Sequence, residues 1–416
     1  MSVGTSAEPA RAADARRHEA TRVPLRVLVI TRIFPNAVEP LSSPFNRQQF
    51  AALGRLCDVE VMATIPWFPA ASLLGRWTKS GALRAVPSRD VIDGLPVTHP
   101  RVLYVPKYGA GLSGALEAAS LLRAVVARKE RVDVVLGSWA YPDGAAAVAL
   151  ARMIGVPAVI KAHGSDLNVL SSMRGVRANL ALALPRASRV VVVSEALGEK
   201  AVALGADRRR IAVVSNGIDR ALFTVRDQRA ARDAVGWRRD GRMVLYCGRM
   251  VREKGIFELL EAFARIAEAE PDLSLAMLGD GPARAEAEAI ARPLGERVTF
   301  LGARPLPEVP VWMSASSIVT LPSHNEGSPN VVREALACGR PVVATAIGGI
   351  PELLTSPMLG EMVPVRDPEA LARALASVAA RPFDATRIAA SCGGSWEDSA
   401  ASLLAVLEDA HREYVT

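Results

Sequence analysis

Residues 323–345 read Ser-His-Asn-Glu-Gly-Ser-Pro-Asn-Val-Val-Arg-Glu-Ala-Leu-Ala-Cys-Gly-Arg-Pro-Val-Val-Ala-Thr, with two carboxylates, Glu326 and Glu334, eight residues apart. Pro329 suits the first turn of a helix, where its missing N–H would have no helical partner, and Ser328 is expected to cap that helix. Glu326 then lies in the loop before the helix and Glu334 in its early turns. Because free amide groups at the start of a helix favour anions, this junction predicts a site for a phosphate bordered by hydroxyl groups.

The length and composition predict a two-domain protein. A chain of 416 residues exceeds the size at which one core stops growing, and 50% of its residues are hydrophobic. The most apolar run, residues 145–160, is interrupted by Arg152 and Pro157 and is too short to span a bilayer. Residues 1–22 lack an apolar segment and a cleavage site, so we expect a disordered leader rather than a signal peptide. A cytoplasmic protein that can work at the inner face of the membrane is expected.

Charge and cysteine usage narrow the class of ligand. The net charge of +7 and the pI of 9.5 fit nucleic acid, an anionic membrane surface or anionic small substrates. The basic residues are scattered and aromatic residues make up only 5%, which argues against nucleic acid. We therefore favour an anionic small substrate and a membrane surface over nucleic acid. Disulfides and zinc are not expected, because the cysteines lie far apart, at Cys57, Cys247, Cys338 and Cys392.

Short β-branched runs alternate with Ala-rich helical segments from residue 25 onward, which is the pattern of βαβ units and parallel sheets. The first half predicts strands at 25–31, 59–63, 132–137, 158–162, 190–194 and 212–214, and helices such as 45–56, 115–129 and 144–154. The second half predicts strands at 243–247, 273–278, 298–301, 318–321 and 341–344, and helices such as 257–270 and 330–338. The sequence therefore predicts an α/β protein with two doubly wound, Rossmann-like domains.

The two halves are expected to join at the turn-forming Asn-Gly within residues 216–219, ahead of a charged stretch at 226–239. We divide the chain into a leader (1–22), a first domain (23–217), a second domain (218–390) and a C-terminal segment (391–416). Ligands of open α/β sheets bind beyond the carboxyl ends of the strands, so the functional residues should face a central cleft.

A basic loop at residues 248–255 follows one strand of the second half and precedes a helix. Arg249 offers a planar fork for phosphate oxygens, and Lys254 offers a compact mobile charge. Together they could neutralise much of the negative charge of a diphosphate, so neither a metal nor another cofactor is expected. Arg252 lies between them and is expected at the surface.

Other polar and glycine residues follow predicted strands. His163 comes directly after the strand 158–162, and its Gly, Ser and Asp neighbours are unlike the apolar setting of a core histidine. Asp166 could contact a ligand or cap a helix. Gly279 and Gly302 end two strands of the second half, where a glycine either lets the backbone approach a ligand or simply ends the strand.

Residues 326–352 resemble the signature of the family 4 retaining glycosyltransferases, which have the two-domain GT-B fold. They contain two Glu residues separated by seven others, then Ala-x-Ala-x-Gly-x-Pro-Val-Val-Ala-Thr and Gly-Gly-x-Pro-Glu. Residues 163–166 also match the His-Gly-x-Asp phrase of that family. The resemblance implies an acceptor-side first domain, a nucleotide-sugar donor domain, and a helix from Trp396 to Tyr414 that crosses back onto the first domain.

The resemblance also implies roles for single residues. In the family, the matching arginine and lysine bind the donor phosphates, the histidine lies beside the donor sugar, and the two glutamates contact the sugar and the ribose. The catalytic candidates carried over are His163, Arg249, Lys254 and Glu326. The substrate-binding candidates are Asp166, Gly279, Gly302, Gly327, Ser328, Pro329, Asn330 and Glu334.

One departure from the family concerns the turn after the first strand, which lacks the usual glycine-rich sequence. Arg32 or Arg47 could replace its contacts with phosphate or acceptor. This variant resembles the teichuronic-acid-type subgroup associated with cell-surface polysaccharides. The loop at residues 65–79 mixes Trp, Phe, Leu and basic residues, a composition that suits either peripheral membrane contact or packing on its own domain.

The expected activity is transfer of a hexosyl group from a nucleoside-diphosphate-sugar to a glycan or lipid-linked acceptor, with retention of configuration, in cell-surface polysaccharide biosynthesis. Two alternatives stay open. A nucleotide-sugar epimerase of the same fold would convert the donor without an acceptor. A non-catalytic nucleotide-sugar-binding subunit would be expected to lack the charged site residues.

Overall fold

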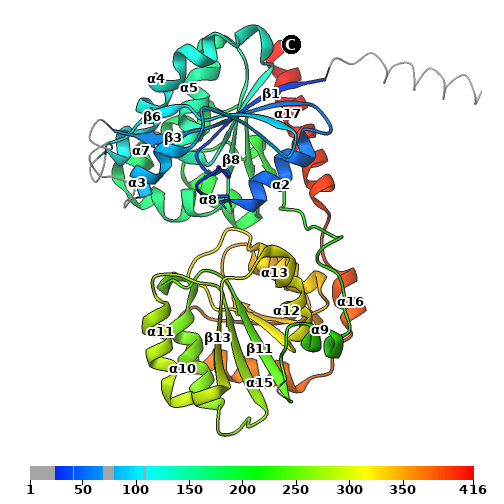
Figure 1. Ribbon diagram of the computed structural model, residues 1–416. Coiled ribbons are helices and arrows are strands. Elements are labelled where there is room, and N and C mark those ends of the chain that lie inside the picture. The colour runs from blue at the N-terminus through cyan, green and yellow to red at the C-terminus, as the bar shows by residue number, and fades with distance from the viewer. Residues whose placement is uncertain (1–23, 41, 69–78, 106–108, 239) are drawn as a thin grey trace, which may run out of the picture.

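A computed structural model describes residues 24–40, 42–68, 79–105, 109–238 and 240–416. It contains two large β-sheets, one from each half of the chain, and each sheet is covered by helices on both faces (Figure 1). The predicted α/β GT-B architecture, with two doubly wound domains, is confirmed. The leader 1–22 and most of the 65–79 loop lie outside the described residues.

The first sheet has the strand order β10-β9-β8-β7-β1-β2-β5-β4. All neighbouring strands are parallel except β4, which runs antiparallel to β5. The register sets Val29 of β1 beside Val61 of β2 and Leu136 of β7. The strands are β1 (Arg26–Thr31), β2 (Asp58–Ala63), β4 (Arg89–Ile92), β5 (Leu95–Thr98), β7 (Val134–Ser138), β8 (Ala158–Ala162), β9 (Arg189–Val192) and β10 (Ile211–Val213).

Two cores cover this sheet. One face packs against α4 (Ser113–Val126), α5 (Ala145–Ile154), α7 (Arg174–Ala183) and α8 (Glu195–Ala203). The other face packs against α2 (Pro44–Leu53) and the C-terminal helix α17 (Trp396–Val415). Leu403 and Leu407 of α17 are buried in the same cluster as Val29 and Phe50, so the last helix crosses back onto the first domain as predicted (Figure 1).

The second sheet is entirely parallel, with the order β13-β12-β11-β14-β15-β16. Its strands are β11 (Arg242–Cys247), β12 (Leu273–Leu278), β13 (Val298–Gly302), β14 (Ile318–Leu321), β15 (Val342–Thr345) and β16 (Gly360–Val363). One face is covered by α9 (Gln228–Ala234), α12 (Val309–Ala315), α13 (Asn330–Ala337), α14 (Ile350–Leu353) and α16 (Ala385–Ala390). The other is covered by α10 (Ile256–Ile266), α11 (Arg284–Ala291) and α15 (Pro368–Ala380).

Several elements were not predicted. The hairpin β4–β5 turns at Asp93-Gly94, both with positive φ, and Asp-Gly between two short apolar runs is a strong hairpin signal. A separate pair, β3 (Ile65–Trp67) with β6 (Arg101–Leu103), and the edge strand β16 were also missed. The charged stretch at 226–239 contains α9, whose N-terminal Asp227 accepts a hydrogen bond from the Ala230 amide. Two further short helices are α3 (Lys79–Ala82) and α6 (Ser165–Asn168).

Among the described residues, we find no helix with the length and apolarity that a bilayer crossing requires.

Candidate functional site

Both halves of the chain line a cavity of about 700 Å³ beyond the carboxyl ends of β8, β11 and β14. It brings together the predicted residues His163, Arg249, Lys254, Glu326, Gly327, Ser328, Pro329 and Asn330. The remaining candidates do not line it in this structure: Asp166, Gly279, Gly302 and Glu334. Residues more than 160 positions apart in the sequence therefore meet at one site.

Lys254 and Glu326 form an ion pair inside this cavity, with Nζ 2.5 Å from Oε1. Lys254 ends a short helical turn after β11, and Glu326 lies in the loop after β14. Gly255 allows the two segments to meet, because it has a φ of 68° and a Cβ there would lie 1.9 Å from the carbonyl oxygen of Pro322. The pair leaves Glu326 only 9% exposed, whereas the side chain of Lys254 keeps 30% of its surface exposed.

Arg249 also lines this cavity and, unlike Lys254, is not paired with a carboxylate of the described residues. Its side chain is exposed and forms no ion pair or hydrogen bond within the described part of the chain. Arg252, by contrast, pairs with Glu286 at 2.9 Å and lies over the ring of Phe257, outside the cavity lining. The surface position expected for Arg252 agrees with these contacts.

The loop before α13 presents backbone amides. The N–H groups of Gly327, Ser328 and Asn330 donate to no other group within the described ranges. One expectation about this loop is wrong: α13 begins at Asn330 with Pro329 as its N-cap residue, and Ser328 provides no side-chain cap. Because the cap is missing, the positive end of the helix stays open to an anionic ligand in the cavity.

Glu334 lies one turn into α13, half-buried, and forms no ion pair in the described structure. Burial raises its pKa from 4.5 to about 7. The unfolded chain loses this proton near pH 4.5, so the carboxylate destabilises the fold progressively as the pH rises from about 4.5 to about 7. Below that window, both states hold the proton and the effect vanishes.

We therefore expect Glu334→Gln to raise the melting temperature at pH 8 and to change it much less at pH 5. The exposed Glu268→Gln is the matched control and should leave both values unchanged. Differential scanning calorimetry of the ligand-free protein measures this, and an equal gain at both pH values would contradict the assigned burial effect.

Gly279 is required by backbone packing at the end of β12, whereas Gly302 at the end of β13 is favoured by its positive φ of 72°. Gly279 has a φ of 135°, and a Cβ there would lie 1.9 Å from the carbonyl oxygen of Gly248. Its own amide donates to the carbonyl of Gly302 at 2.9 Å. The glycines thus hold the loop that carries Arg249 against its neighbours, while their contact with a nucleotide stays a prediction.

His163 lies at the end of β8 on the opposite side of the cavity. Its Nε2 is 2.9 Å from Ser138 Oγ, and its ring centroid is 4.9 Å from that of Phe45. Burial lowers the pKa of His163 well below its usual value, and the nearby Lys161 lowers it further. The imidazole is therefore neutral at physiological pH.

Asp166 organises the backbone around His163. Its buried carboxylate accepts hydrogen bonds from the amides of Ala140, Gly164, Leu167 and His163 at 2.8 to 3.2 Å. Burial still raises its pKa above the usual value. These bonds account for Asp166 as a residue that shapes the loop, and direct contact with substrate stays a prediction.

Beside the cavity, Gly327 of the second domain packs directly against the backbone of the first domain. A Cβ on Gly327 would lie 2.2 Å from the carbonyl oxygen of His163 and 2.9 Å from Cα of Gly164. Ser194 Oγ donates to the Gly327 carbonyl at 3.2 Å, and Asn168 Nδ2 donates to Asn325 Oδ1 at 2.9 Å.

A further contact joins the two halves at α8. The amides of Glu195 and Ala196, at the start of this helix, donate to the carboxylate of Glu352, each at 3.1 Å. A carboxylate at a helix N-terminus is stabilised by the amides and by the helix dipole. The domains are therefore held in a closed arrangement.

Comparison with known proteins agrees with this architecture. Residues 42–217 match the glycosyl transferase 4-like domain, and residues 241–381 match the glycosyl transferases group 1 family. A Bacillus subtilis protein named as the teichuronic acid biosynthesis glycosyltransferase TuaC is 30% identical over 340 residues, which cover 79% of this chain and 83% of that protein. The chain belongs to the family 4 glycosyltransferases. TuaC places it with the cell-surface polysaccharide type.

Other relatives of this glycosyltransferase span most of its length. D-inositol 3-phosphate glycosyltransferase 1 of Catenulispora acidiphila is 28% identical over 405 residues, covering 90% of this chain and 95% of that protein. Among solved structures, Anabaena HepE in complex with UDP superposes with a TM-score of 0.70 at 20% identity, covering 92% of this chain and 100% of that one. Sucrose-phosphate synthase from Thermosynechococcus elongatus gives 0.69 at 20% identity, with coverages of 93% and 97%.

The two arginines considered as replacements for the family's glycine-rich turn differ in this glycosyltransferase. Arg47 is held by Asp93 through two hydrogen bonds of 2.7 and 2.8 Å, outside the cavity lining. Arg32 lies at the end of β1, with Nη2 3.6 Å from Glu117 and with a buried Nε that has no partner among the described residues. Neither arginine lines the cavity, so a contact of Arg32 or Arg47 with phosphate or acceptor stays a prediction.

Some residues of the cavity were not predicted. Asn216, expected only to form the turn between domains, donates from Nδ2 to Asn330 Oδ1 at 2.9 Å and lines the cavity. Phe45 and Val169 line it from the first domain. An Asn-Gly pair in the sequence predicts only a turn, and only the fold shows that Asn216 lies in the cavity and that α2 and α6 lie near α13.

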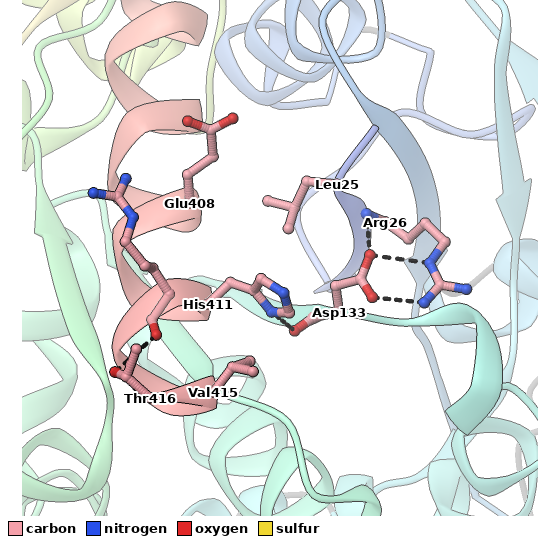
Figure 2. A pocket seen from close by; sticks show the side chains of 8 residues that line it. Leu25, Arg26, Asp133, Glu408, His411, Val415 and Thr416 are labelled. Atoms are coloured by element: carbon pink, nitrogen blue, oxygen red, sulfur yellow. Dashed lines mark hydrogen bonds and ion pairs between the residues drawn. The ribbon is translucent and has the colours of Figure 1, made fainter. Parts of the chain in front are cut away.

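A second cavity, of about 580 Å³, lies at the amino ends of β1 and β7, beside the end of α17 (Figure 2). Several of its polar groups are paired: the Arg26 guanidinium donates two hydrogen bonds to the Asp133 carboxylate, and His411 Nδ1 lies 3.2 Å from the Asp133 carbonyl oxygen. It contains none of the predicted site residues, and its contacts account for how α17 attaches to the sheet.

Proposed function

We propose that this glycosyltransferase transfers a hexosyl group from a nucleoside-diphosphate-sugar to a glycan or lipid-linked acceptor, with retention of configuration. The observation that carries the proposal is the convergence of Arg249, Lys254 and the open amides before α13 in one cavity. Two cations and several free N–H groups suit a diphosphate. Glu326 and His163 border the same cavity and can accept hydrogen bonds from sugar hydroxyl groups.

The proposed chemistry depends on charge that develops at the leaving group. As the bond between the sugar carbon and the phosphate oxygen breaks, its electrons pass to the diphosphate. Arg249, Lys254 and the amides of Gly327, Ser328 and Asn330 stabilise that negative charge. The acceptor hydroxyl enters on the face that the diphosphate leaves, and the released phosphate oxygen can take its proton. No covalent intermediate with the protein is invoked.

The donor side is proposed to hold a nucleotide above the second sheet. Glu334 would accept hydrogen bonds from the ribose, and Gly279 and Gly302 would border the base. Solved relatives of the fold, such as HepE, were crystallised with UDP, which makes UDP-sugars the first donors to test.

A lipid-linked acceptor is favoured by the surface next to the cavity. Val169 lines the cavity and is 47% exposed, and Leu112 and Met173 are 59% and 47% exposed on segments that contact α7. Arg174 and Arg177 of α7 are exposed beside them. Apolar side chains flanked by arginines suit peripheral contact with an anionic membrane. Transfer to a lipid-linked acceptor in anionic vesicles, compared with neutral vesicles, tests this, and equal rates would contradict it.

The Lys254–Glu326 ion pair must separate, at least in part, when a diphosphate binds. Glu326→Gln releases Lys254, so we expect UDP to bind about threefold to tenfold more tightly, as the loss of a partly buried pair of about 1 kcal/mol implies. Transfer should nevertheless fall, because the variant weakens the contact with the sugar. Calorimetric titration and initial rates measure the two effects, and tighter UDP binding with faster transfer would contradict the role of Glu326.

The decisive test of the activity is a transfer assay with UDP-, GDP- and ADP-sugars and membrane-extracted acceptors, followed by NMR of the product. A new glycosidic bond with the configuration of the donor supports the proposal. Conversion of the donor without an acceptor would instead support an epimerase, and binding without any turnover would support a non-catalytic subunit.

A further inference from the structure

A chain of hydrogen bonds leads from His163 into the core of the first domain. Nε2 of His163 lies 2.9 Å from Ser138 Oγ, and Ser138 Oγ lies 3.2 Å from Asn46 Oδ1. Asn46 Nδ2 in turn donates to the carbonyl oxygen of Ile33 at 2.9 Å. Both Ser138 and Asn46 are 0% exposed, so water does not compete for these bonds.

The direction of every bond in this chain is fixed by its last member. The Ile33 carbonyl only accepts, so the amide of Asn46 must turn its NH₂ toward it and its oxygen toward Ser138. That oxygen also only accepts, so the Ser138 hydroxyl must donate to it. Ser138 Oγ then has lone pairs left for His163, and Nε2 of His163 must carry the proton.

The opposite tautomer leaves an unsatisfied group. If Nδ1 of His163 carried the proton, both Nε2 and Asn46 Oδ1 would need the single hydroxyl hydrogen of Ser138. One buried acceptor would then lack a donor, which is costly in a closed interior. In the structure, Nδ1 is buried and has no partner among the described residues.

We propose that Asn46 and Ser138 are positioning residues that hold His163 as the neutral Nε2–H tautomer and so keep its Nδ1 lone pair for a hydroxyl group of the sugar bound in the cavity. The functional part of this inference rests on the proposed glycosyltransferase reaction. In this role, Nδ1 of His163 is unprotonated and can only accept a hydrogen bond. The sugar at this position must therefore present a hydroxyl group, and a carboxylate there would be repelled.

The tautomer can be measured without any substrate. The chain has five histidines, so NMR of protein labelled with ¹⁵N-histidine, compared with His163→Gln, identifies the His163 signals. We expect an unprotonated Nδ1 and a protonated Nε2 at neutral pH. A protonated Nδ1 in the native protein would overturn the proposal.

Variants separate positioning from simple packing. In Asn46→Leu, the Ser138 hydroxyl is free to donate to Nε2, so the population should shift toward the Nδ1–H tautomer. Asn46→Asp keeps an acceptor for Ser138 when its second carboxyl oxygen is protonated and donates to the Ile33 carbonyl, and in that state it should keep the native tautomer. Ser138→Ala should broaden or shift the Nε2 signal. Ser314→Ala, which removes another buried hydroxyl bonded to a carbonyl in the second domain, is the matched control and should change nothing.

The same variants connect the tautomer to the sugar. With UDP-glucose and UDP-galactose as probes, we expect Nδ1 to shift on binding of an active donor and not on binding of UDP. Asn46→Leu and Ser138→Ala should lower kcat/KM about tenfold, the equivalent of one positioned hydrogen bond, and leave the Kd of UDP unchanged. An unmoved Nδ1 signal or unchanged kcat/KM would overturn the inference, whereas failure of UDP itself to bind would instead count against the proposed function.

Discussion

Replacing Lys254 by alanine is expected to lower kcat/KM for sugar transfer by at least about hundredfold and to weaken UDP binding about tenfold. Lys254 lines the cavity, with Nζ 2.5 Å from Glu326 Oε1, and is one of two lining cations that can meet the charge of a diphosphate. Its removal also leaves Glu326 without its cation, so the cavity becomes more negative where an anion must bind. The loss should exceed that from an ordinary surface lysine.

The matched control is Arg252→Ala in the same loop. Arg252 has the same charge sign, its side chain is 64% exposed, and it pairs with Glu286 outside the cavity. If diphosphate binding depended only on the general positive charge of the loop, both variants would lose affinity equally. Titration calorimetry with UDP and initial rates distinguish the two outcomes, and equal losses would contradict the assigned role of Lys254.

Gly327→Ala is expected to lower kcat/KM at least about hundredfold while leaving the melting temperature nearly unchanged. The added Cβ would lie 2.2 Å from the His163 carbonyl and 2.9 Å from Gly164 Cα, and all of these are backbone atoms of the other domain. Each domain has its own cores, so the molecule can relieve the clash by opening between them. Opening separates His163 from Glu326 and Lys254.

Small-angle scattering should show a larger radius of gyration for Gly327→Ala. The control is Gly198→Ala, a buried helical glycine of the first domain where a Cβ would meet its nearest atoms at 3.5 and 3.6 Å. That variant should keep native size and activity. A Gly327→Ala protein with native dimensions and full activity would show that the glycine contact does not set the closed arrangement.

The sequence predicts the two parallel sheets well because each buried strand is a compact β-branched run bounded by helical patterns. The strands that were missed lie where that signal is weak. In the hairpin β4–β5, every second side chain faces solvent, and the signal is carried by the Asp93-Gly94 turn rather than by hydrophobicity. β16 is an edge strand of only four residues that begins with glycine.

The structure brings Arg249, Lys254, Glu326 and His163 into one cavity, as their charges and the family resemblance led us to expect, while their roles stay predictions. Contacts that depend on packing were missed. No local pattern shows that Gly255 is needed for a backbone contact with Pro322, or that Asn216 reaches α13. The predicted Ser328 cap was wrong because Pro329 is the N-cap residue and leaves the serine one position too early.

The central claim is that the cavity binds a nucleoside diphosphate through protein cations and amides. The most direct measurement is calorimetric titration of UDP, GDP and ADP into the native protein and Lys254→Ala, each with and without a chelator. We predict that one nucleotide binds the native protein with or without chelator and binds Lys254→Ala about tenfold more weakly. Absence of binding by all three nucleotides, or equal binding to both proteins, would contradict the account.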